Sequence, residues 1–174
     1  SYEIEAWASS TTGAIVWVKV PQVNGTSTTD NIYMHYGDAS AADGQNATSV
    51  WNSDYVGVWH LNQTPTGSSG DIRDSSSYGI HGTSTGSITQ TPGQIDGSID
   101  MTASSNYVTI ASSTHIRQAD ESLTVELWIK GDAQADYSGL LDMSDPNYRY
   151  VGSQDGYALT AFNAGQIRFY LESV

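Results

Sequence analysis

The chain has 174 residues, of which 38% are hydrophobic, and it carries 19 Asp and Glu against 6 Lys and Arg, for a net charge of -13. Nucleic acid and anionic membrane surfaces are therefore excluded as partners, because like charges repel. The absence of Cys excludes a disulfide framework and thiol redox chemistry, and no stretch approaches the roughly 18 apolar residues of a membrane span.

Three short strands are predicted in the first 54 residues. Tyr2–Trp7 alternates apolar and acidic residues, which is the period of a half-buried strand. Ala14–Val20 is rich in β-branched residues and ends at Pro21, which cannot continue a ladder. The two runs predict a hairpin, and Ile32–Tyr36 predicts a third strand.

The rest of the chain continues the all-β pattern around one long polar stretch. Tyr55–Leu61 predicts a strand, and Asn62–Pro92 is almost wholly polar, so we expect a loop that is functional, stabilised by an ion or wrapped over a core edge. The later predicted strands are Gly97–Met101, Tyr107–Ile110, Leu123–Lys130, Leu140–Met143, Tyr157–Phe162 and Gln166–Leu171. Many short strands separated by turns indicate antiparallel sheets in a sandwich or barrel.

Several of these segments resemble known families in the right order. Val58–Asn62 (VWHLN), Asp74–Gly82 (DSSSYGIHG) and Gly93–Met101 (GQIDGSIDM) resemble the first half of a laminin-G-like, concanavalin A-like jelly roll. Residues 2–54, with YEIEAW, VWVKVP and IYMHYG, resemble the end of an uncharacterised β domain often placed upstream of such jelly rolls. The prediction is an antiparallel β-sandwich, incomplete, at 55–174, preceded by a partial upstream β domain at 1–54.

The resemblance implies an extracellular or cell-surface module without catalytic activity that binds glycans or proteins. The resembling jelly roll has further strands after Gln166–Leu171, and Tyr2–Trp7 opens inside a strand pattern. We therefore expect a chain cut from something longer, whose open strand edges contact neighbouring domains or other copies. A structural subunit or repeat of an adhesin or filament is the alternative function.

A glycoside hydrolase or lyase is the least favoured function, because hydrolysis needs two carboxyl groups flanking the scissile bond. Glu3 and Glu5 share one face of a predicted strand, but no third acid follows, and we expect a solvated face. Glu126 stands alone on its strand. The sequence therefore predicts no enzyme and no catalytic residue.

Calcium is the one cofactor for which the sequence offers candidates. The four His residues have no zinc-like spacing, and we expect His60 to be a packed residue. Calcium takes oxygen ligands, and Asp74 followed by small residues and glycines could wrap an ion, with Asp96 and Asp100 as weaker candidates. The alternative is an Asx turn, in which Asp74 accepts hydrogen bonds from its own backbone.

For glycan binding, flat aromatic rings beside polar groups are the physical requirement. Trp128 is predicted on one strand face with Glu126, and Arg168 and Tyr170 on the analogous face of the last strand. These four residues form a predicted ligand platform. The alternative is that the same side chains form a second core layer against a neighbouring domain.

Overall fold

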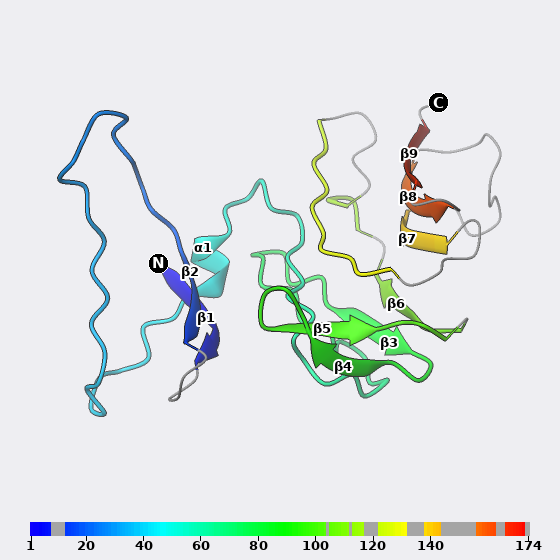
Figure 1. Cartoon of the computed structure of the whole chain (residues 1–174), viewed down its shortest axis with the longest axis horizontal. Coiled ribbons are helices and arrows are strands. Elements are labelled where there is room, and N and C mark those ends of the chain that lie inside the picture. The colour runs from blue at the N-terminus through cyan, green and yellow to red at the C-terminus, as the bar shows by residue number, and fades with distance from the viewer. Residues whose placement is uncertain are drawn as a thin grey trace. The chain divides into compact units, whose positions relative to one another are not determined.

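The computed structural model describes residues 1–7, 13–103, 105–111, 113–116, 122–131, 138–143, 156–162 and 166–172. The chain forms two compact units, Ser1–Ala111 and Ser112–Val174. In the described residues the strands pair antiparallel in small sheets, and one short helix is present (Figure 1). The all-β prediction is confirmed at this level, whereas these small sheets do not themselves amount to a jelly-roll sandwich.

The chain begins with the predicted hairpin. β1 (Tyr2–Trp7) pairs antiparallel with β2 (Ala14–Val18), and the register shifts between Ile4 and Ala6. The alternating pattern therefore identified both strands, although β2 ends two residues earlier than predicted. This register shift lies next to Glu5.

The segment after the hairpin corrects one prediction. Ile32–Tyr36 forms no strand, and its side chains are exposed, with Tyr33 81% accessible. A β-favouring sequence forms a strand only where a partner strand completes the ladder, and the described residues supply none here. The chain regains regular structure at α1 (Ala47–Val50), where the side chain of Asn46 accepts a hydrogen bond from Ser49 N at 3.1 Å.

The remainder of the first unit contains two strand pairs. β3 (Gly82–Thr85) pairs with β6 (Tyr107–Ile110), and β4 (Thr89–Pro92) pairs with β5 (Gly97–Asp100). β5 and β6 confirm two predicted strands. β3 and β4 lie inside the stretch predicted as a polar loop, and that prediction was wrong because their sequences, GTST and TQTP, show no hydrophobic alternation.

A small core explains why such polar strands are stable here. Ile72 is fully buried and Ile88 is buried beside these strands. Gly82 approaches its partner strand so closely that a β-carbon would lie 2.7 Å from Val108 Cγ1. The predicted strand Tyr55–Leu61 is reduced to one isolated bridge between Trp59 and Asp74, so it was also wrong as a strand.

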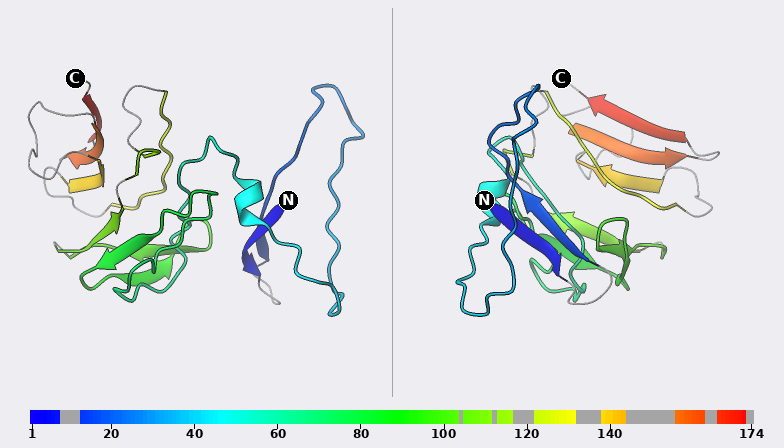
Figure 2. Two further views of the ribbon diagram at one scale, coloured as in Figure 1. Left: turned by 180° about the vertical axis from the view of Figure 1, so that it is seen from behind. Right: turned by 60° about the vertical axis from the view of Figure 1, so that its left-hand side comes forward.

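The second unit contains a three-stranded antiparallel sheet. β7 (Ser138–Asp142), β8 (Gly156–Phe162) and β9 (Gln166–Glu172) lie in the order β7-β8-β9, which Figure 2 shows from two sides. All three were predicted within a few residues. Tyr157, Thr160 and Ala161 of the central strand are buried, so both faces of β8 carry a buried side chain.

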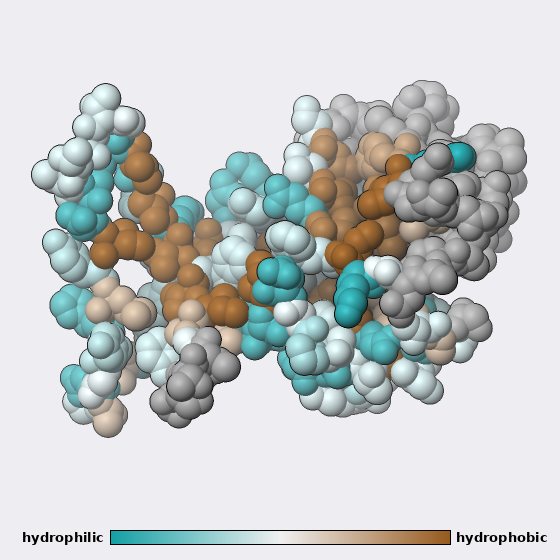
Figure 3. All heavy atoms as spheres, in the orientation of Figure 1, coloured by the Kyte–Doolittle hydropathy of each residue, from teal (hydrophilic) through white to brown (hydrophobic). Residues whose placement is uncertain are grey.

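Leu123–Lys130 is the main correction in this unit, because the segment is described but is not a strand. Leu127, Trp128 and Ile129 are all exposed, Trp128 to 75%. Apolar surface (brown in Figure 3) is therefore visible in this unit as well as in the first. A perfect alternating pattern was not sufficient to bring this segment into a sheet.

The compact units divide after Ala111. The boundary predicted at Asp54 rests on two family resemblances and not on compactness, and it stays a prediction. Residues on both sides of it are hydrogen-bonded, as in the contact of Ser75 Oγ with Glu3 Oε1 at 2.6 Å. Within the described ranges, no helix has the length and hydropathy needed to cross a bilayer.

Candidate functional site

The inward face of β1 carries a buried pair of acids. Glu3 and Glu5 are two residues apart, so their side chains leave the strand on the same face. Their side chains are only 12% and 1% exposed, and His60 lies between them with 8% exposure. The prediction of a solvated strand face was wrong, because alternation shows which residues share a face but not which face the rest of the chain covers.

His60 contacts both acids. Its Nε2 atom lies 3.3 Å from Glu3 Oε2, and its Nδ1 atom lies 3.3 Å from Glu5 Oε2. The Nε2 atom is buried, and its contact with Glu3 lacks the geometry of a hydrogen bond. His60 is buried, as expected of a packed histidine, but the expected satisfied ring is not found, because its Nε2 atom has no hydrogen-bond partner among the described residues.

Two tryptophans and one serine complete the surroundings of the carboxylates. Trp51 Nε1 donates to Glu3 Oε2 at 2.8 Å, and Trp17 Nε1 donates to Glu5 Oε2 at 2.5 Å. Ser75 Oγ donates to the second oxygen of Glu3. These donors replace the water that each carboxylate lost on burial, which is the condition for a stable buried charge.

Aromatic rings close the site, and we call the whole set the acid–aromatic cluster: Glu3, Glu5, Trp17, Trp51, Tyr55 and His60. The ring of Trp17 lies 5.8 Å from that of His60 and 5.2 Å from that of Trp51, and Trp51 lies 5.1 Å from Tyr55. Such ring pairs fix side-chain orientation in addition to burying area. The cluster shields its acids from solvent, and its hydrogen bond and ring contacts to Trp51 hold that side chain in one position.

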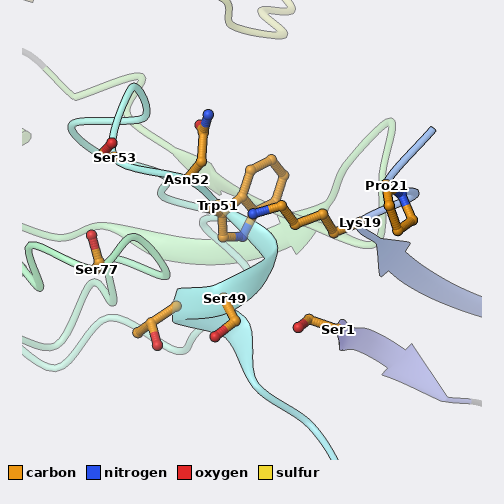
Figure 4. A pocket seen from close by; sticks show the side chains of 9 residues that line it. Ser1, Lys19, Pro21, Ser49, Trp51, Asn52, Ser53 and Ser77 are labelled. Atoms are coloured by element: carbon orange, nitrogen blue, oxygen red, sulfur yellow. The ribbon is translucent and has the colours of Figure 1, made fainter.

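Trp51 also borders the hollow that we take as the candidate binding site. This hollow has a volume of about 430 Å³ and lies in the first unit. Figure 4 shows Lys19, Asn52 and the hydroxyls of Ser49 and Ser53 around the Trp51 ring. The full lining is Ser1, Lys19, Pro21, Thr48, Ser49, Trp51, Asn52, Ser53 and Ser77. We call it the Trp51 hollow.

The loop predicted to hold calcium is held by hydrogen bonds. Asp74 is buried, and its Oδ1 atom accepts from Val58 N and Ser76 N, each at 2.8 Å. Its Oδ2 atom accepts from Ser76 Oγ and Ile80 N, also at 2.8 Å. A carboxylate offers about four acceptor positions, and all of them are used here.

The bond from Ser76 N is the Asx turn, the alternative that the sequence left open. A calcium ion at Asp74 would have to displace donors that already satisfy it, so the residues present do not fit the ion.

Asp71 acts in the same way on the other side of the loop. Its Oδ2 atom accepts from Thr66 N at 2.7 Å and Gly67 N at 2.8 Å, and Ser84 donates to both carboxylate oxygens. Burial by itself would raise the pKa of Asp71, but the bonds from Ser84, Thr66 and Gly67 outweigh it and hold the pKa far below its ordinary value. The polar stretch is therefore ordered by two carboxylates.

The weaker calcium candidates lie in ordinary turns. Asp96 adopts a positive φ of 50° in the turn between β4 and β5. Asp100 ends β5, and hydrogen bonds from the backbone and side chain of Thr102 lower its pKa. Among the described residues, no group of three or more His, Asp or Glu side chains could hold a metal ion.

The predicted platform of Trp128, Glu126, Arg168 and Tyr170 lies in the second unit. Glu126 and Trp128 are exposed in the irregular segment, and Arg168 is exposed on β9. Tyr170 pairs with Ala158 through its backbone, and its side chain lies outside the described residues. Trp128, Glu126 and Arg168 are not among the residues that line the Trp51 hollow.

The comparisons with known proteins concern the part of the chain that forms this site. Residues 1–72, which are less than half of the chain, match the family model described as a domain of unknown function, DUF2341. No curated protein and no solved structure matches the chain. The whole acid–aromatic cluster and most of the lining of the Trp51 hollow lie within the matched residues.

Proposed function

We propose that this chain is a non-catalytic carbohydrate-recognition module and that the Trp51 hollow is its binding site. One observation carries the proposal: a tryptophan ring, oriented from behind by Glu3, borders an open hollow whose other walls are hydroxyls, an amide and an amine. Sugars present both apolar C–H faces and polar hydroxyls, so an aromatic ring among short polar side chains suits them.

The rigidity of the hollow supports binding. Trp51 is held by its hydrogen bond to Glu3 and by ring contacts with Trp17 and Tyr55. A side chain already held in place loses little conformational freedom when a ligand binds, so less of the interaction energy is consumed. The volume of about 430 Å³ lies within the range of roughly 300–1,000 Å³ that is typical of ligand sites, and it is adequate for a short saccharide.

The same cluster argues against hydrolysis. Glu3 and Glu5 are enclosed by His60 and two indoles, and a general acid or nucleophile must reach the scissile bond. The proposal therefore keeps the absence of catalysis that the sequence predicts. It also keeps an extracellular or cell-surface location and a laminin-G-like jelly-roll relationship for the later residues, which rest on the resemblance of VWHLN and DSSSYGIHG.

The experiment is saccharide binding by the whole chain, with oligosaccharides immobilised on an array and affinities measured by calorimetry. Ser53→Trp places a bulky side chain at the exposed rim of the Trp51 hollow without changing the cluster, and we expect it to abolish binding. Trp128→Ala is the matched control and should leave binding unchanged. Loss of binding in Trp128→Ala with full binding in Ser53→Trp would instead favour the platform in the second unit.

A structural role in assembly is the second candidate, and a separate observation favours it. Leu127, Trp128 and Ile129 are consecutive and exposed, and Ile167 and Phe169 are exposed on one face of the edge strand β9. Apolar surface and an open sheet edge are features that proteins normally cover. Light scattering over a range of concentrations tests this role, and a monomer at all concentrations would remove it.

A further inference from the structure

The Trp51 hollow contains a cation where cations are scarce. Among residues 1–111, Lys19 and Arg73 are the only Lys and Arg. The acidic residues of the same range are Glu3, Glu5, Asp30, Asp38, Asp43, Asp54, Asp71, Asp74, Asp96 and Asp100. One of the two cations therefore lines the hollow that the first unit offers to a ligand.

Lys19 does not belong to an ion pair within the described part of the chain. Several carboxylates of the first unit have other partners: Glu3 and Glu5 face His60, and Asp71 and Asp74 accept hydrogen bonds from their own loops. Asp54, which follows Ser53 of the hollow in the chain, accepts a hydrogen bond from Asn52 Nδ2 at 2.9 Å. Lys19 is exposed, and its side chain extends toward the Trp51 ring (Figure 4). An amine in this position is available to an anionic group of the ligand.

Accepting the proposed function, we infer that the saccharide bound in the Trp51 hollow is acidic and that its carboxylate pairs with Lys19. The sugar ring would lie against the indole of Trp51, with Ser49 and Asn52 within reach of its hydroxyls. A uronic acid is the chemical class that combines a pyranose ring with one carboxylate. Lysine acts toward such an anion as a mobile point charge with three donors.

The charge of the rest of the protein narrows this class further. With a net charge of -13 the protein repels a polyanion as a whole, whereas Lys19 favours negative charge in the Trp51 hollow. A single acidic sugar, at the end of a chain or flanked by neutral sugars, satisfies both conditions. A regularly charged polysaccharide does not, and its affinity should fall as the number of its charges rises.

The test compares matched oligosaccharides that differ only at one terminal sugar: neutral, uronic acid, the methyl ester of that acid, and a sulfated sugar. Calorimetry on the whole chain should show the uronic acid binding about twofold to fivefold more tightly than the neutral sugar and the ester, which is the upper part of the range for one exposed charge pair. Added salt should reduce this difference, because salt screens exposed charges.

Two variants assign the effect to Lys19. Lys19→Met should abolish the preference for the acidic over the neutral sugar, and Lys19→Arg should retain it. Arg73→Met is the matched control, because Arg73 is the other cation of the first unit, is exposed and does not line the hollow. Circular dichroism should show the same fold for all three variants, since both side chains are exposed.

The outcomes separate this inference from the function on which it rests. Equal binding of the neutral and acidic sugars, or an acid preference that survives Lys19→Met, overturns the inference and leaves carbohydrate recognition standing. Equal or tighter binding of the sulfated sugar overturns the assignment to a carboxylate. If none of the saccharides binds and the variants are folded, the proposed function itself fails.

Discussion

Replacing His60 with phenylalanine tests whether the acid–aromatic cluster organises the first unit. The substitution preserves an aromatic ring that can stack on Trp17, but it removes the group that lies between two buried carboxylates. Glu5, whose side chain is 1% exposed, would then face an apolar ring instead of a polar partner. The perturbation therefore changes electrostatics more than it changes packing.

The expected loss follows from the contacts that remain. Removing one partner of a fully buried ion pair costs about 3–5 kcal/mol of folding free energy, because the other charge stays buried without compensation. Here Trp17, Trp51 and Ser75 still donate to the two carboxylates, and Glu3 retains some solvent contact. We therefore expect a smaller loss, about 2–3 kcal/mol, since hydrogen bonds to charged groups contribute about 1.5–3 kcal/mol each.

Urea denaturation followed by tryptophan fluorescence is the suitable assay, because Trp17 and Trp51 both contact His60. His35→Phe is the matched control: His35 is exposed, so its replacement should change the free energy of unfolding by less than about 0.5 kcal/mol. A double-mutant cycle with Glu5→Gln should return a coupling energy of at least about 1 kcal/mol. Additive effects, or a His60→Phe protein as stable as the wild type, would refute the structural role of the cluster.

Three further predictions concern the loop of the first unit. Asp74→Ala should lower the free energy of unfolding by about 3 kcal/mol or more, because it leaves the N–H groups of Val58, Ser76 and Ile80 without their acceptor. Chelator should leave the melting temperature of the wild type unchanged, and a chelator-dependent melt that Asp74→Ala abolishes would restore the calcium prediction. The pKa of Asp71 is far below its ordinary value of 3.8 in the folded chain, so the Asp71 carboxylate contributes its full stabilisation above pH 3.8 and loses it as the pH falls below 3.8. Acid titration of the free energy of unfolding should show this loss, and an equally steep loss in Asp71→Asn would contradict the assignment to Asp71. Gly82→Ala should destabilise the β3–β6 pair by about 1–3 kcal/mol in thermal melts, because its β-carbon would lie 2.7 Å from Val108, whereas the exposed Gly25→Ala should be nearly neutral.

The candidate site illustrates where sequence reasoning ended. Glu3 and Glu5 were recognised as sharing a face, but their burial depends on Trp51, His60 and Ser75, which are dozens of residues away. The sequence did not predict Trp51 as a site residue, because no motif surrounds it. A usable signal did exist: two acids alternating with apolar residues on a strand, in a chain segment that also contains several Trp and a His, indicate a buried polar network as readily as a solvated face.

The sequence by itself determined the all-β class, the β1–β2 hairpin and the three strands of the second unit, because alternation and turns act between neighbouring residues. It also offered the Asx turn at Asp74 as one of two alternatives, and the structure contains that turn.

Only the tertiary structure decided which strand-like segments became strands and which face of β1 turned inward. Leu123–Lys130 has the better alternating pattern yet forms no strand, whereas the polar β3 does, because its partner β6 and the buried Ile72 lie beside it. A ladder and a buried charge each depend on groups from distant parts of the chain, and local pattern contains no information about which groups those are.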